Sequence, residues 1–462
     1  MALSFDHPPV LAVCTAVKAA GGRAYLVGGT VRDRLMGSTA DARDYDLEVY
    51  GLDGAALRAV LQNFGRVNTV GEAFTVYKIG DIDVSIPRRD SKTGDGHKGF
   101  TVVGDPTMTI EEAARRRDFT INAILVDPLS GEILDPYGGR ADLQARRLRA
   151  VDAATFVEDS LRVLRGMQFA ARFEFTIDPA TVALCRSIPL DDLPSERIWG
   201  EFEKLLLRAR RPSIGMQAGL ELGVMEKLFP DFQALVGCPQ EPAWHPEGDV
   251  WVHTLQAIDL AAQFIDDLPM PKQVAVMLGT LCHDLGKPPT TKVLDGRIRS
   301  LDHEAAGIPP TERVLDRLNI HTMDGYDVRK QIVALVDNHL KPGVFYKEGA
   351  KVGDAAFRRL ALKCEIDLLY RVAKADSLGR VAPGAKPPNA DAQEWFLSRA
   401  KELSVRHEPE KPLLLGRHLL EMGLPPGPKI GEITAKVYEF QLDGRVRTLD
   451  DARAEAKRLL GR

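Results

Sequence analysis

Two aspartates separated by one residue, Asp44 and Asp46, could bind the same divalent cation. Side chains two apart on an extended strand point to one face, so their carboxylates would lie together. A third aspartate, Asp83, alternates with apolar residues in the segment 81–86 and is expected on a neighbouring strand. Carboxylates that hold two metal ions about 3.5–4 Å apart stabilise both the attacking and the leaving oxygen of a phosphoryl transfer. The pattern therefore predicts a metal-dependent transfer site.

A glycine pair, Gly28 and Gly29, lies upstream of these aspartates and leads into a short segment with helical spacing, residues 30–36. The backbone N–H groups of a glycine turn and the positive end of a helix can both face a triphosphate. Nucleotidyl transfer requires such a phosphate-binding turn beside the metal carboxylates. The glycine turn and the aspartates each predict nucleotidyl transfer only weakly, but their occurrence together in this order strengthens that prediction.

A second group of residues with metal-binding chemistry lies between residues 250 and 380. It contains an adjacent His-Asp pair with a histidine upstream and an aspartate downstream, a mixed ligand set that suits a divalent transition metal. A metal held in this way can activate a water molecule to attack a phosphoester. The residues of this group are His253, His283, Asp284, His303, His339 and Asp376.

The first site must be positioned by a sheet. Apolar segments alternate with helical ones in this part of the chain, and the last two expected strands form a hairpin. Residues 88–99 are rich in charge and glycine and have no apolar period, so we expect a mobile loop there. The expected strands are 24–27, 46–50, 74–79 and 81–86, and the expected helices are 30–36 and 55–63.

From residue 155 onward, apolar residues recur at three- and four-residue spacing, which predicts helices. Proline-bearing segments near residue 240 and at 383–388 indicate linkers. The clearest expected helices are 156–172, 181–187, 198–207 and 216–222. We therefore expect a head at 20–145, a helical neck and body at 146–240, a metal-binding helical domain at 245–380 and a helical tail at 390–462.

The composition favours a soluble globular protein. Hydrophobic residues make up 44% and charged residues 27% of the chain, with no apolar run of about 18 residues and no secretory signal pattern. We therefore expect a cytoplasmic protein without membrane contact.

The five cysteines have no CxxC spacing, which argues against a disulfide framework or a zinc knuckle. The net charge of −4 does not indicate nucleic-acid binding, but an arginine-rich segment at 140–172 could follow a phosphate backbone.

Several motifs in a fixed order resemble one known family. They are Gly28-Gly29-x-Val31-Arg32-Asp33, Asp44-x-Asp46, Arg117-Asp118-Phe119-Thr120-Ile121-Asn122-Ala123 and Glu158-Asp159-x-x-Arg162. This set is similar to that of the class II tRNA nucleotidyltransferase and bacterial poly(A) polymerase family. The segment 281–287 resembles the HD phosphohydrolase superfamily. That resemblance implies that His253, His283, Asp284 and Asp376 are the metal ligands and that His303 and His339 could serve as the additional ligands of bimetallic members. The resemblance implies an α+β fold with a DNA polymerase β-type head (a mixed sheet with helices), an all-helical neck and body, an HD domain and a helical tail.

The resemblance also implies roles for residues of the head. Asp44 and Asp46 would bind Mg²⁺, and Asp83 would be a metal ligand or the general base for the primer 3′-hydroxyl. The glycine turn and the helix after it would hold the triphosphate and ribose, and the motif 117–123 would distinguish ribose from deoxyribose. The nucleotide-binding residues implied in this way are Gly28, Gly29, Arg32, Asp33, Arg117, Asp118 and Asn122.

A further motif falls where the family keeps its protein template for the incoming base. Its residues are Glu158, Asp159 and Arg162, and Arg165 extends this nucleotide-binding set. Arginine is a fixed fork of donors and aspartate a pure acceptor. Positions 159 and 162 are expected on one helical face, where they could satisfy a cytosine or adenine edge and leave uracil or guanine mismatched.

The activity implied by the resemblance is template-independent addition of CCA to tRNA 3′ ends from CTP and ATP, with an HD phosphohydrolase site that binds a divalent transition metal. Poly(A) polymerase, or an enzyme that adds only CC or only A, shares every motif and stays an alternative. A rival from another class is an HD phosphohydrolase whose head only binds RNA or nucleotide, although a binding module would not need the aspartate set. The expected partners are tRNA, CTP and ATP, with no DNA and no membrane.

Overall fold

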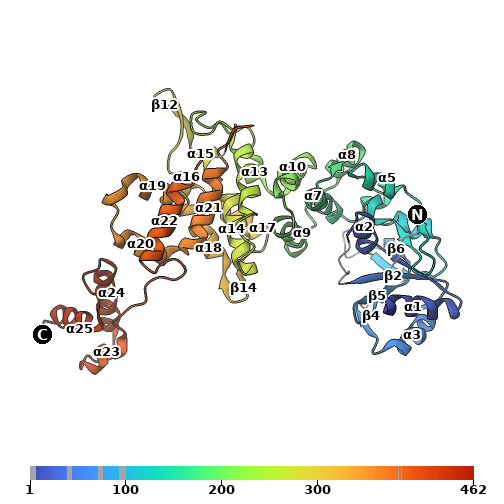
Figure 1. Cartoon of the computed structure of the whole chain (residues 1–462), viewed down its shortest axis with the longest axis horizontal. Helices are drawn as coiled ribbons and strands as arrows, with labels where there is room; N and C mark the ends of the chain where they lie inside the picture. The colour runs from blue at the N-terminus through green and yellow to red at the C-terminus, as the bar shows by residue number, and fades with distance from the viewer. Residues whose placement is uncertain are drawn as a thin grey trace. The chain divides into compact units, whose positions relative to one another are not determined.

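The computed structural model describes residues 7–38, 44–70, 76–92, 100–382, 384–386 and 388–461. The chain forms two compact units, and Figure 1 colours it from the N-terminus to the C-terminus. The first unit comprises residues 1–205 and 214–228, and the second comprises residues 206–213 and 229–462. No helix in the described ranges is long and apolar enough to cross a membrane. The division of the chain into four parts stays a prediction.

The first unit is built around a sheet of seven strands in the order β3-β4-β5-β2-β1-β8-β9. All neighbouring pairs are antiparallel except β2 and β5, which run parallel. The predicted mixed sheet and the β4–β5 hairpin are therefore confirmed. The strands are β1 (Arg23–Val27), β2 (Tyr45–Tyr50), β3 (Asn68–Val70), β4 (Val76–Ile79), β5 (Ile82–Ser85), β8 (Leu125–Val126) and β9 (Ile133–Leu134).

Helices α1 (Pro8–Ala19) and α3 (Gly54–Leu61) lie together beside this sheet (Figure 1). Their apolar residues and alternate residues of the strands, such as Leu47 of β2 and Val84 of β5, form one buried core. Full burial of a leucine or valine side chain contributes about 1.5–3 kcal/mol relative to exposure, and a slip of one residue would turn every such side chain outward. The core therefore fixes which residues of β2 and β5 face away from it.

The expectation of a loop over residues 88–99 is wrong for residues 88–92. They form β6 (Arg88–Lys92), which pairs antiparallel with β7 (Phe100–Gly104) in a separate ribbon. Pairing satisfies the backbone N–H and C=O groups of both strands without an apolar period, so the polar composition does not reveal it. The prediction for residues 93–99 lies outside the described residues.

The helical part of the first unit differs from the prediction at one point. The expected helix 156–172 is interrupted, because α6 ends at Phe156 and α7 begins at Leu161. Asp159 lies in the interruption and its carboxylate accepts the Leu161 N–H at 3.1 Å, a competition with the backbone that favours helix starts over helix interiors. The remaining elements are α2 (Gly29–Leu35), η1 (Gln62–Phe64), α4 (Ile110–Arg115), η2 (Thr120–Asn122), α5 (Gly139–Gln144), β10 (Arg147–Leu148), α6 (Ala153–Phe156), α7 (Leu161–Phe173), β11 (Thr176–Ile177), α8 (Pro179–Ser187), α9 (Ser195–Arg208), α10 (Pro212–Glu221) and α11 (Val224–Leu228).

The second unit is mainly helical. Helices α13 (Val250–Ala261), α14 (Met270–Cys282), α18 (Val328–Asn338) and α21 (Ile366–Leu378) pack against one another, as Figure 1 shows. Two short ribbons, β12 (Thr291–Leu294) with β13 (Arg297–Ser300) and β14 (Thr322–Met323) with β15 (Tyr326–Asp327), connect helices. The other helices are α12 (Pro230–Gln233), α15 (Lys287–Thr290), α16 (His303–Ala306), α17 (Ile308–Arg317), α19 (Lys341–Glu348), η3 (Gly349–Lys351), α20 (Asp354–Lys363), α22 (Asp391–Glu402), α23 (Gly416–Glu421), α24 (Pro428–Leu442) and α25 (Leu449–Leu459).

Candidate functional sites

The predicted catalytic aspartates lie at the sheet face that points away from the α1–α3 core. Strands β2 and β5 pair in parallel with Asp46 opposite Asp83, while Leu47 and Val84 fill the core. Because side chains alternate, Asp46 and Asp83 project from the other face. Asp44 lies immediately before β2 and is exposed. The structure thus brings two of the three aspartates into register and places the third at the start of the same strand.

The electrostatics of this cluster fit a cation. Burial raises the pKa of Asp46, and the Asp83 and Asp44 carboxylates raise it further, while Arg117 and Lys78 oppose them. The Lys78 Nζ lies 3.3 Å from Asp83 Oδ1 and 4.0 Å from Asp44 Oδ1. Among the described residues no group forms a well-directed hydrogen bond to the buried Asp83 Oδ1. Crowded carboxylates, one with an oxygen that has an ion-pair contact but no directed hydrogen bond, are a suitable ligand set for a divalent ion such as Mg²⁺.

The glycine turn lies against the same aspartates. Gly28 has a φ of 72° and is the residue before α2. A Cβ at this position would lie 3.6 Å from Asp46 Oδ2 and 3.7 Å from Arg117 Nη1. Glycine tolerates this left-handed backbone, and the missing side chain leaves room beside the carboxylate. The turn and the acidic cluster therefore border one space.

A continuous hydrogen-bond network joins several of the predicted nucleotide-binding residues. Arg32 donates from Nε to Asp33 Oδ1 at 2.8 Å and from Nη1 to Asn122 Oδ1 at 2.7 Å. Asn122 Nδ2 donates to Asp118 Oδ1 at 2.9 Å, and Arg165 Nε donates to Asp118 Oδ2 at 2.6 Å. The network ties α2 and η2 to α7, so it fixes the orientation of the helix that follows the glycine turn.

Two buried ionic groups anchor this network. Although burial raises the pKa of Asp118, the ion pair with Arg165 and the hydrogen bond from Asn122 hold it below its usual value. The Arg32 guanidinium is buried and lies 4.4 Å from the centroid of the Phe173 ring, within reach of a cation–π interaction. Arg32 therefore positions its neighbours, and its contact with a triphosphate stays a prediction.

The predicted template residues are arranged differently from expectation. Asp159 precedes the N-cap Ser160 of α7, so the expected helical face shared by positions 159 and 162 is wrong. The Asp159 carboxylate is held by Arg197 of α9, whose Nη2 lies 3.1 Å from Oδ2. The sequence Ser195-Glu196-Arg197-Ile198 resembles the next helical motif of the same family, for which we expect a positioning role, and the contact with Asp159 agrees with that expectation.

Arg162 is also engaged within the protein. Its guanidinium donates to the main-chain carbonyls of Thr155 and Arg116, at 2.6 Å in each case. Glu158 is exposed. The roles of these residues in base selection stay predictions, and the structure adds that Arg162 and Asp159 are each held by partners other than one another.

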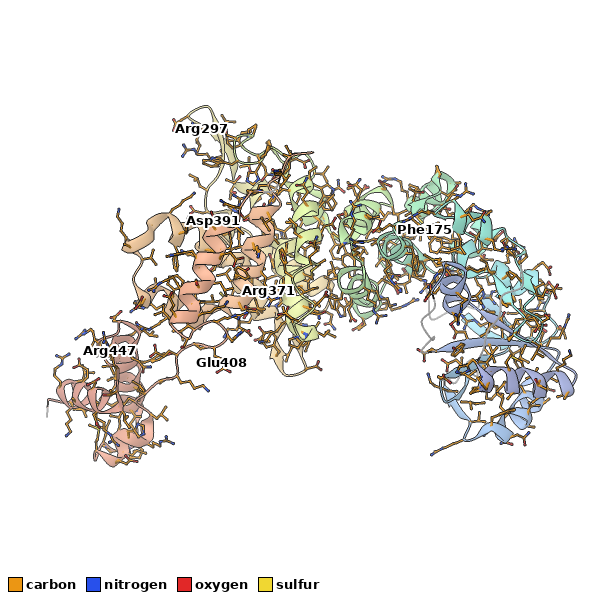
Figure 2. All side chains as sticks on the ribbon, in the orientation of Figure 1. Phe175, Arg297, Arg371, Asp391, Glu408 and Arg447 are labelled. Carbon is orange, nitrogen blue, oxygen red and sulfur yellow. The ribbon has the colours of Figure 1, made fainter. Side chains whose placement is uncertain are left out.

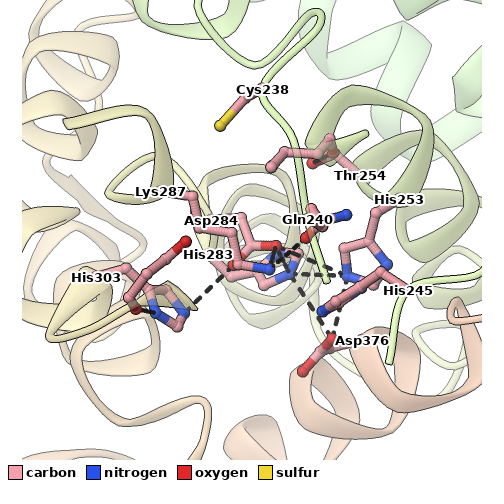
Figure 3. A network of polar contacts seen from close by, with 12 residues as sticks. Cys238, Gln240, His245, His253, Thr254, His283, Asp284, Lys287, His303 and Asp376 are labelled. Atoms are coloured by element: carbon pink, nitrogen blue, oxygen red, sulfur yellow. Dashed lines mark hydrogen bonds and ion pairs between the residues drawn. The ribbon is translucent and has the colours of Figure 1, made fainter. Parts of the chain in front are cut away.

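The histidines and aspartates of the second cluster converge on a buried centre (Figure 3). His253 Nε2 lies 3.3 Å from His283 Nε2 and 3.1 Å from Asp376 Oδ1. Asp284 directs Oδ2 to His283 Nε2 at 3.1 Å and Oδ1 to His303 Nε2 at 3.4 Å. The carboxylate of Asp284 therefore stands between two groups of ligand atoms.

His339 belongs to the second of these groups. Its Nε2 lies 3.3 Å from His303 Nε2 and 4.0 Å from Asp284 Oδ1. Burial lowers the pKa of His339 to about 3, which keeps the ring neutral and able to bind a metal. The two groups, each with ligand atoms within 4.8 Å of one another, are His253, His283 and Asp376, and Asp284, His303 and His339. A third set that meets the same distance, His245, Glu247 and His253, shares His253 with the first.

Hydrogen bonds behind the rings turn the histidine Nε2 atoms toward the centre. The Nδ1 atoms of His283, His303 and His339 contact the carbonyl three residues earlier at 2.7, 2.8 and 2.7 Å. Because a carbonyl only accepts, Nδ1 carries the hydrogen, so in the neutral ring Nε2 presents a lone pair. Converging lone pairs beside two carboxylates fit one or two divalent transition-metal ions.

Comparisons with known proteins identify the family. A model of the poly A polymerase head domain matches residues 24–149, and a model of the probable RNA and SrmB-binding site of polymerase A matches residues 174–235. The multifunctional CCA protein of Xanthomonas campestris pv. campestris (strain B100) is 35% identical over 421 residues, which cover 89% of this chain and 96% of that protein. The chain belongs to the class II CCA-adding enzyme family.

Two solved structures of CCA-adding enzymes share its fold. The Bacillus stearothermophilus enzyme in complex with CTP has a TM-score of 0.60 and 21% identity, and 98% of each chain is covered. The Thermotoga maritima enzyme complexed with tRNA has a TM-score of 0.58 and 19% identity, with 97% of this chain and 94% of that chain covered. The α+β fold with a polymerase β-type head is thereby confirmed, and membership of the CCA-adding family implies dependence on a divalent metal.

Sequence reasoning missed two residues, His245 and Glu247, that lie beside the histidine centre. Glu247 has no exposed side-chain area, and its Oε1 lies 2.9 Å from His245 Nδ1 and 2.8 Å from His253 Nδ1. Although burial raises the pKa of Glu247, the two imidazoles lower it to about 2. Glu247 therefore occupies the position next to Nδ1 of His253 that main-chain carbonyls occupy next to Nδ1 of the other three histidines. The segment 245–247 indicated only a domain boundary because of its proline.

Two cations also border this centre. Lys287 Nζ lies 2.8 Å from Asp284 Oδ2, and Arg380 Nη2 donates to both Asp376 oxygens at 2.8 Å. Although burial raises the pKa of both carboxyls, His283 and Lys287 hold that of Asp284 well below its usual value, and Arg380 does the same for Asp376. Both aspartates are therefore anionic and able to bind a metal.

Proposed function

We propose that this protein adds CCA to the 3′ ends of tRNA from CTP and ATP. A relative named as a multifunctional CCA protein matches it along nearly the whole chain, and CCA-adding enzymes of the same fold have been solved with CTP and with tRNA. Within this chain, the register of β2 and β5 carries the proposal. It sets Asp46 beside Asp83 and against the Gly28 turn, so the proposed metal ligands and the proposed phosphate-binding turn meet at one face of the sheet.

The transfer site works through the aspartates. Mg²⁺ bound by Asp44 and Asp46 supplies positive charge beside the transferring phosphoryl group. Asp83 acts as a further ligand or takes the proton from the tRNA 3′-hydroxyl. The raised pKa of Asp46 supports this assignment, because a carboxylate that is partly buried and lies beside two other carboxylates gains from binding a cation.

The nucleotide is held by residues around the glycine turn. Their backbone N–H groups face the triphosphate, and the network from Arg32 to Arg165 keeps the turn and α7 in a fixed relation. Base selection falls to Asp159 and Arg162, with Arg197 as a positioning residue for Asp159. The proposed nucleotide-binding residues are Gly28, Gly29, Arg32, Asp33, Arg117, Asp118, Asn122, Glu158, Asp159, Arg162 and Arg165.

The test uses a tRNA transcript that lacks CCA, supplied with CTP alone, ATP alone or both. The expected products are CC with CTP alone and CCA with both nucleotides. A long A tract from ATP would replace the proposal with poly(A) polymerase. Addition of only CC or only A from the mixture would identify a partial enzyme, and no incorporation at all would favour a head that only binds RNA or nucleotide.

A second activity is supported by the buried histidine centre. We propose that His253, His283, Asp284 and Asp376 hold a divalent transition metal, with His303 and His339 completing a two-metal site. A metal held by these residues would supply a Lewis acid for hydrolysis of a phosphoester in a nucleotide or at an RNA end. The supporting observation is that Asp284 directs one oxygen to each group of histidines.

The hydrolase test measures the release of product from 2′,3′-cyclic AMP after chelation and re-addition of single metals. Activity that returns with Mn²⁺, Co²⁺ or Ni²⁺ and is lost in His283→Ala supports the proposal. Activity that persists in His283→Ala, or that no metal restores, contradicts it. The matched control is His321→Ala, because His321 is exposed and lies outside both ligand groups.

A further inference from the structure

The β12–β13 ribbon presents a row of unpaired positive charge. Figure 1 shows the ribbon projecting from the helices of the second unit, and Figure 2 places Arg297 at its tip. In the antiparallel register Lys292 lies opposite Arg299, and Arg297 lies opposite Leu294. Directly opposed residues share a face, so three cations project from one side of the ribbon. All three are exposed, and none forms an ion pair with another described residue.

This arrangement does not serve the stability of the ribbon. Like charges directly opposite one another, as at Lys292 and Arg299, destabilise a strand pair. The ribbon is instead shaped by its two-residue turn, Asp295 and Gly296, which have φ values of 52° and 71° and suit the twist of a tight hairpin. The cations are thus held on a preformed arm and are available to an external anion.

Both ends of the arm are tied to groups of the histidine centre. Thr291 Oγ1 donates to the Lys287 carbonyl at 2.7 Å and lies 2.7 Å from Ser300 Oγ. Lys287 in turn contacts Asp284, and the Ser300 carbonyl accepts the hydrogen bond from His303 Nδ1 at 2.8 Å. A strand of ligand bound along the arm therefore lies next to the metal-binding residues.

We propose that the cationic face of β12–β13 binds the phosphate backbone of a single-stranded RNA whose 3′-terminal phosphoester is delivered to the histidine centre. This inference rests on the proposed hydrolase function and names its substrate class. Arg297 and Arg299 are two residues apart, about 6.8 Å along a strand, so they can meet successive phosphates of an extended chain. The arginine fork pairs with phosphate oxygens in two-bond geometry.

Steady-state kinetics of the full chain test the proposal. The substrates are an oligoribonucleotide of about ten residues that ends in a 2′,3′-cyclic phosphate and the mononucleotide 2′,3′-cyclic AMP. In K292A/R297A/R299A we expect the KM for the oligonucleotide to rise about tenfold at low salt, with kcat and the mononucleotide kinetics unchanged. The control K347A/K351A/K363A removes three exposed cations from the same unit and should match the wild type. Equal KM values in all three proteins would overturn the proposal.

A second readout does not depend on hydrolysis. All five cysteines are buried, so Asp295→Cys provides one accessible thiol for an environment-sensitive dye at the tip of the arm. RNA should change its emission, and the slope of log affinity against log salt should be shallower by about 2 when the three cations are absent. Polyglutamate serves as a polyanion that lacks phosphate. If the emission changes with polyglutamate but not with RNA, or changes with neither, the proposal is overturned. A response to RNA by a protein that hydrolyses neither substrate would remove the hydrolase assignment and leave the RNA-binding arm.

Discussion

At the residue scale, Asp46 is the side chain on which the transfer site depends most. It faces Asp83 across two parallel strands and borders the Gly28 turn. We expect Asp46→Ala to lower nucleotide incorporation about 100-fold or more, because a bound cation contributes several kcal/mol to the transition state. Binding of tRNA, measured by fluorescence anisotropy, should be nearly unchanged. The control is Asp81→Ala in the neighbouring turn, and full turnover by the Asp46 variant would refute the assignment.

Glu247 allows a residue-scale test at the second centre. Its carboxylate lies 2.8 Å from His253 Nδ1, and such a contact fixes the tautomer that leaves Nε2 free for a metal. We expect Glu247→Gln to weaken metal affinity about 10- to 100-fold, as measured by calorimetric titration of the metal-free protein. Glu304→Gln is the matched control, because His303 Nδ1 already contacts a carbonyl and Glu304 is 3.6 Å away. An equal loss of metal affinity in both variants would mean that the negative charge near the site, and not the contact with His253, strengthens metal binding.

At the scale of elements, the network through Asp118 holds α2, η2 and α7 together. The pKa of Asp118 is lower in the folded protein than in the unfolded chain, where it is about 3.9. The ionised carboxylate therefore stabilises the fold fully above about pH 3.9, and this contribution is lost as the pH falls through the folded pKa. We therefore expect Asp118→Asn to lower the free energy of unfolding by about 1–3 kcal/mol at pH 7 and by less at pH 3. Urea unfolding followed by circular dichroism measures both values. The exposed Glu226→Gln should change little, and a pH-independent difference for Asp118→Asn would contradict the ion-pair explanation.

The contact between α9 and the start of α7 makes a prediction about selectivity. Arg197 holds the Asp159 carboxylate, so its removal frees an acceptor that should face the base. We expect Arg197→Ala to raise misincorporation of UTP about tenfold relative to CTP, with a smaller loss of total incorporation. Competition assays on tRNA that lacks CCA measure the ratio. The control is Arg208→Ala at the other end of α9, which should leave selectivity unchanged. Unchanged selectivity in Arg197→Ala would contradict a role of Asp159 in base selection.

The same elements show what the sequence could and could not predict. Alternation along β2 and β5 placed Asp46 and Asp83 on one face, because a period of two leaves no other choice once the apolar residues are buried. Asp159 was misplaced because helical spacing of apolar residues does not show where a side chain takes over a backbone N–H. Glu247 was missed because its partner His253 lies in another element, and only folding brings them together.

At the scale of the whole molecule, the chain carries two proposed metal-binding sites of different chemistry, one in each compact unit. The aspartate cluster lies in the first unit and offers only oxygen ligands, whereas the histidine centre lies in the second and offers mainly nitrogen. Oxygen sets suit Mg²⁺, and imidazole sets suit transition metals. We therefore expect chelator-treated protein to regain nucleotide addition with Mg²⁺ alone, while hydrolysis of 2′,3′-cyclic AMP returns only with Mn²⁺, Co²⁺ or Ni²⁺.

Variants separate the two sites in the same assays. Asp46→Ala should abolish nucleotide addition and leave metal-restored hydrolysis within twofold of the wild type, and His283→Ala should do the reverse. Each substitution removes a proposed ligand inside one unit. If His283→Ala also abolished CCA addition while the protein kept its circular dichroism spectrum, the two activities would share a centre and the independence of the sites would be wrong.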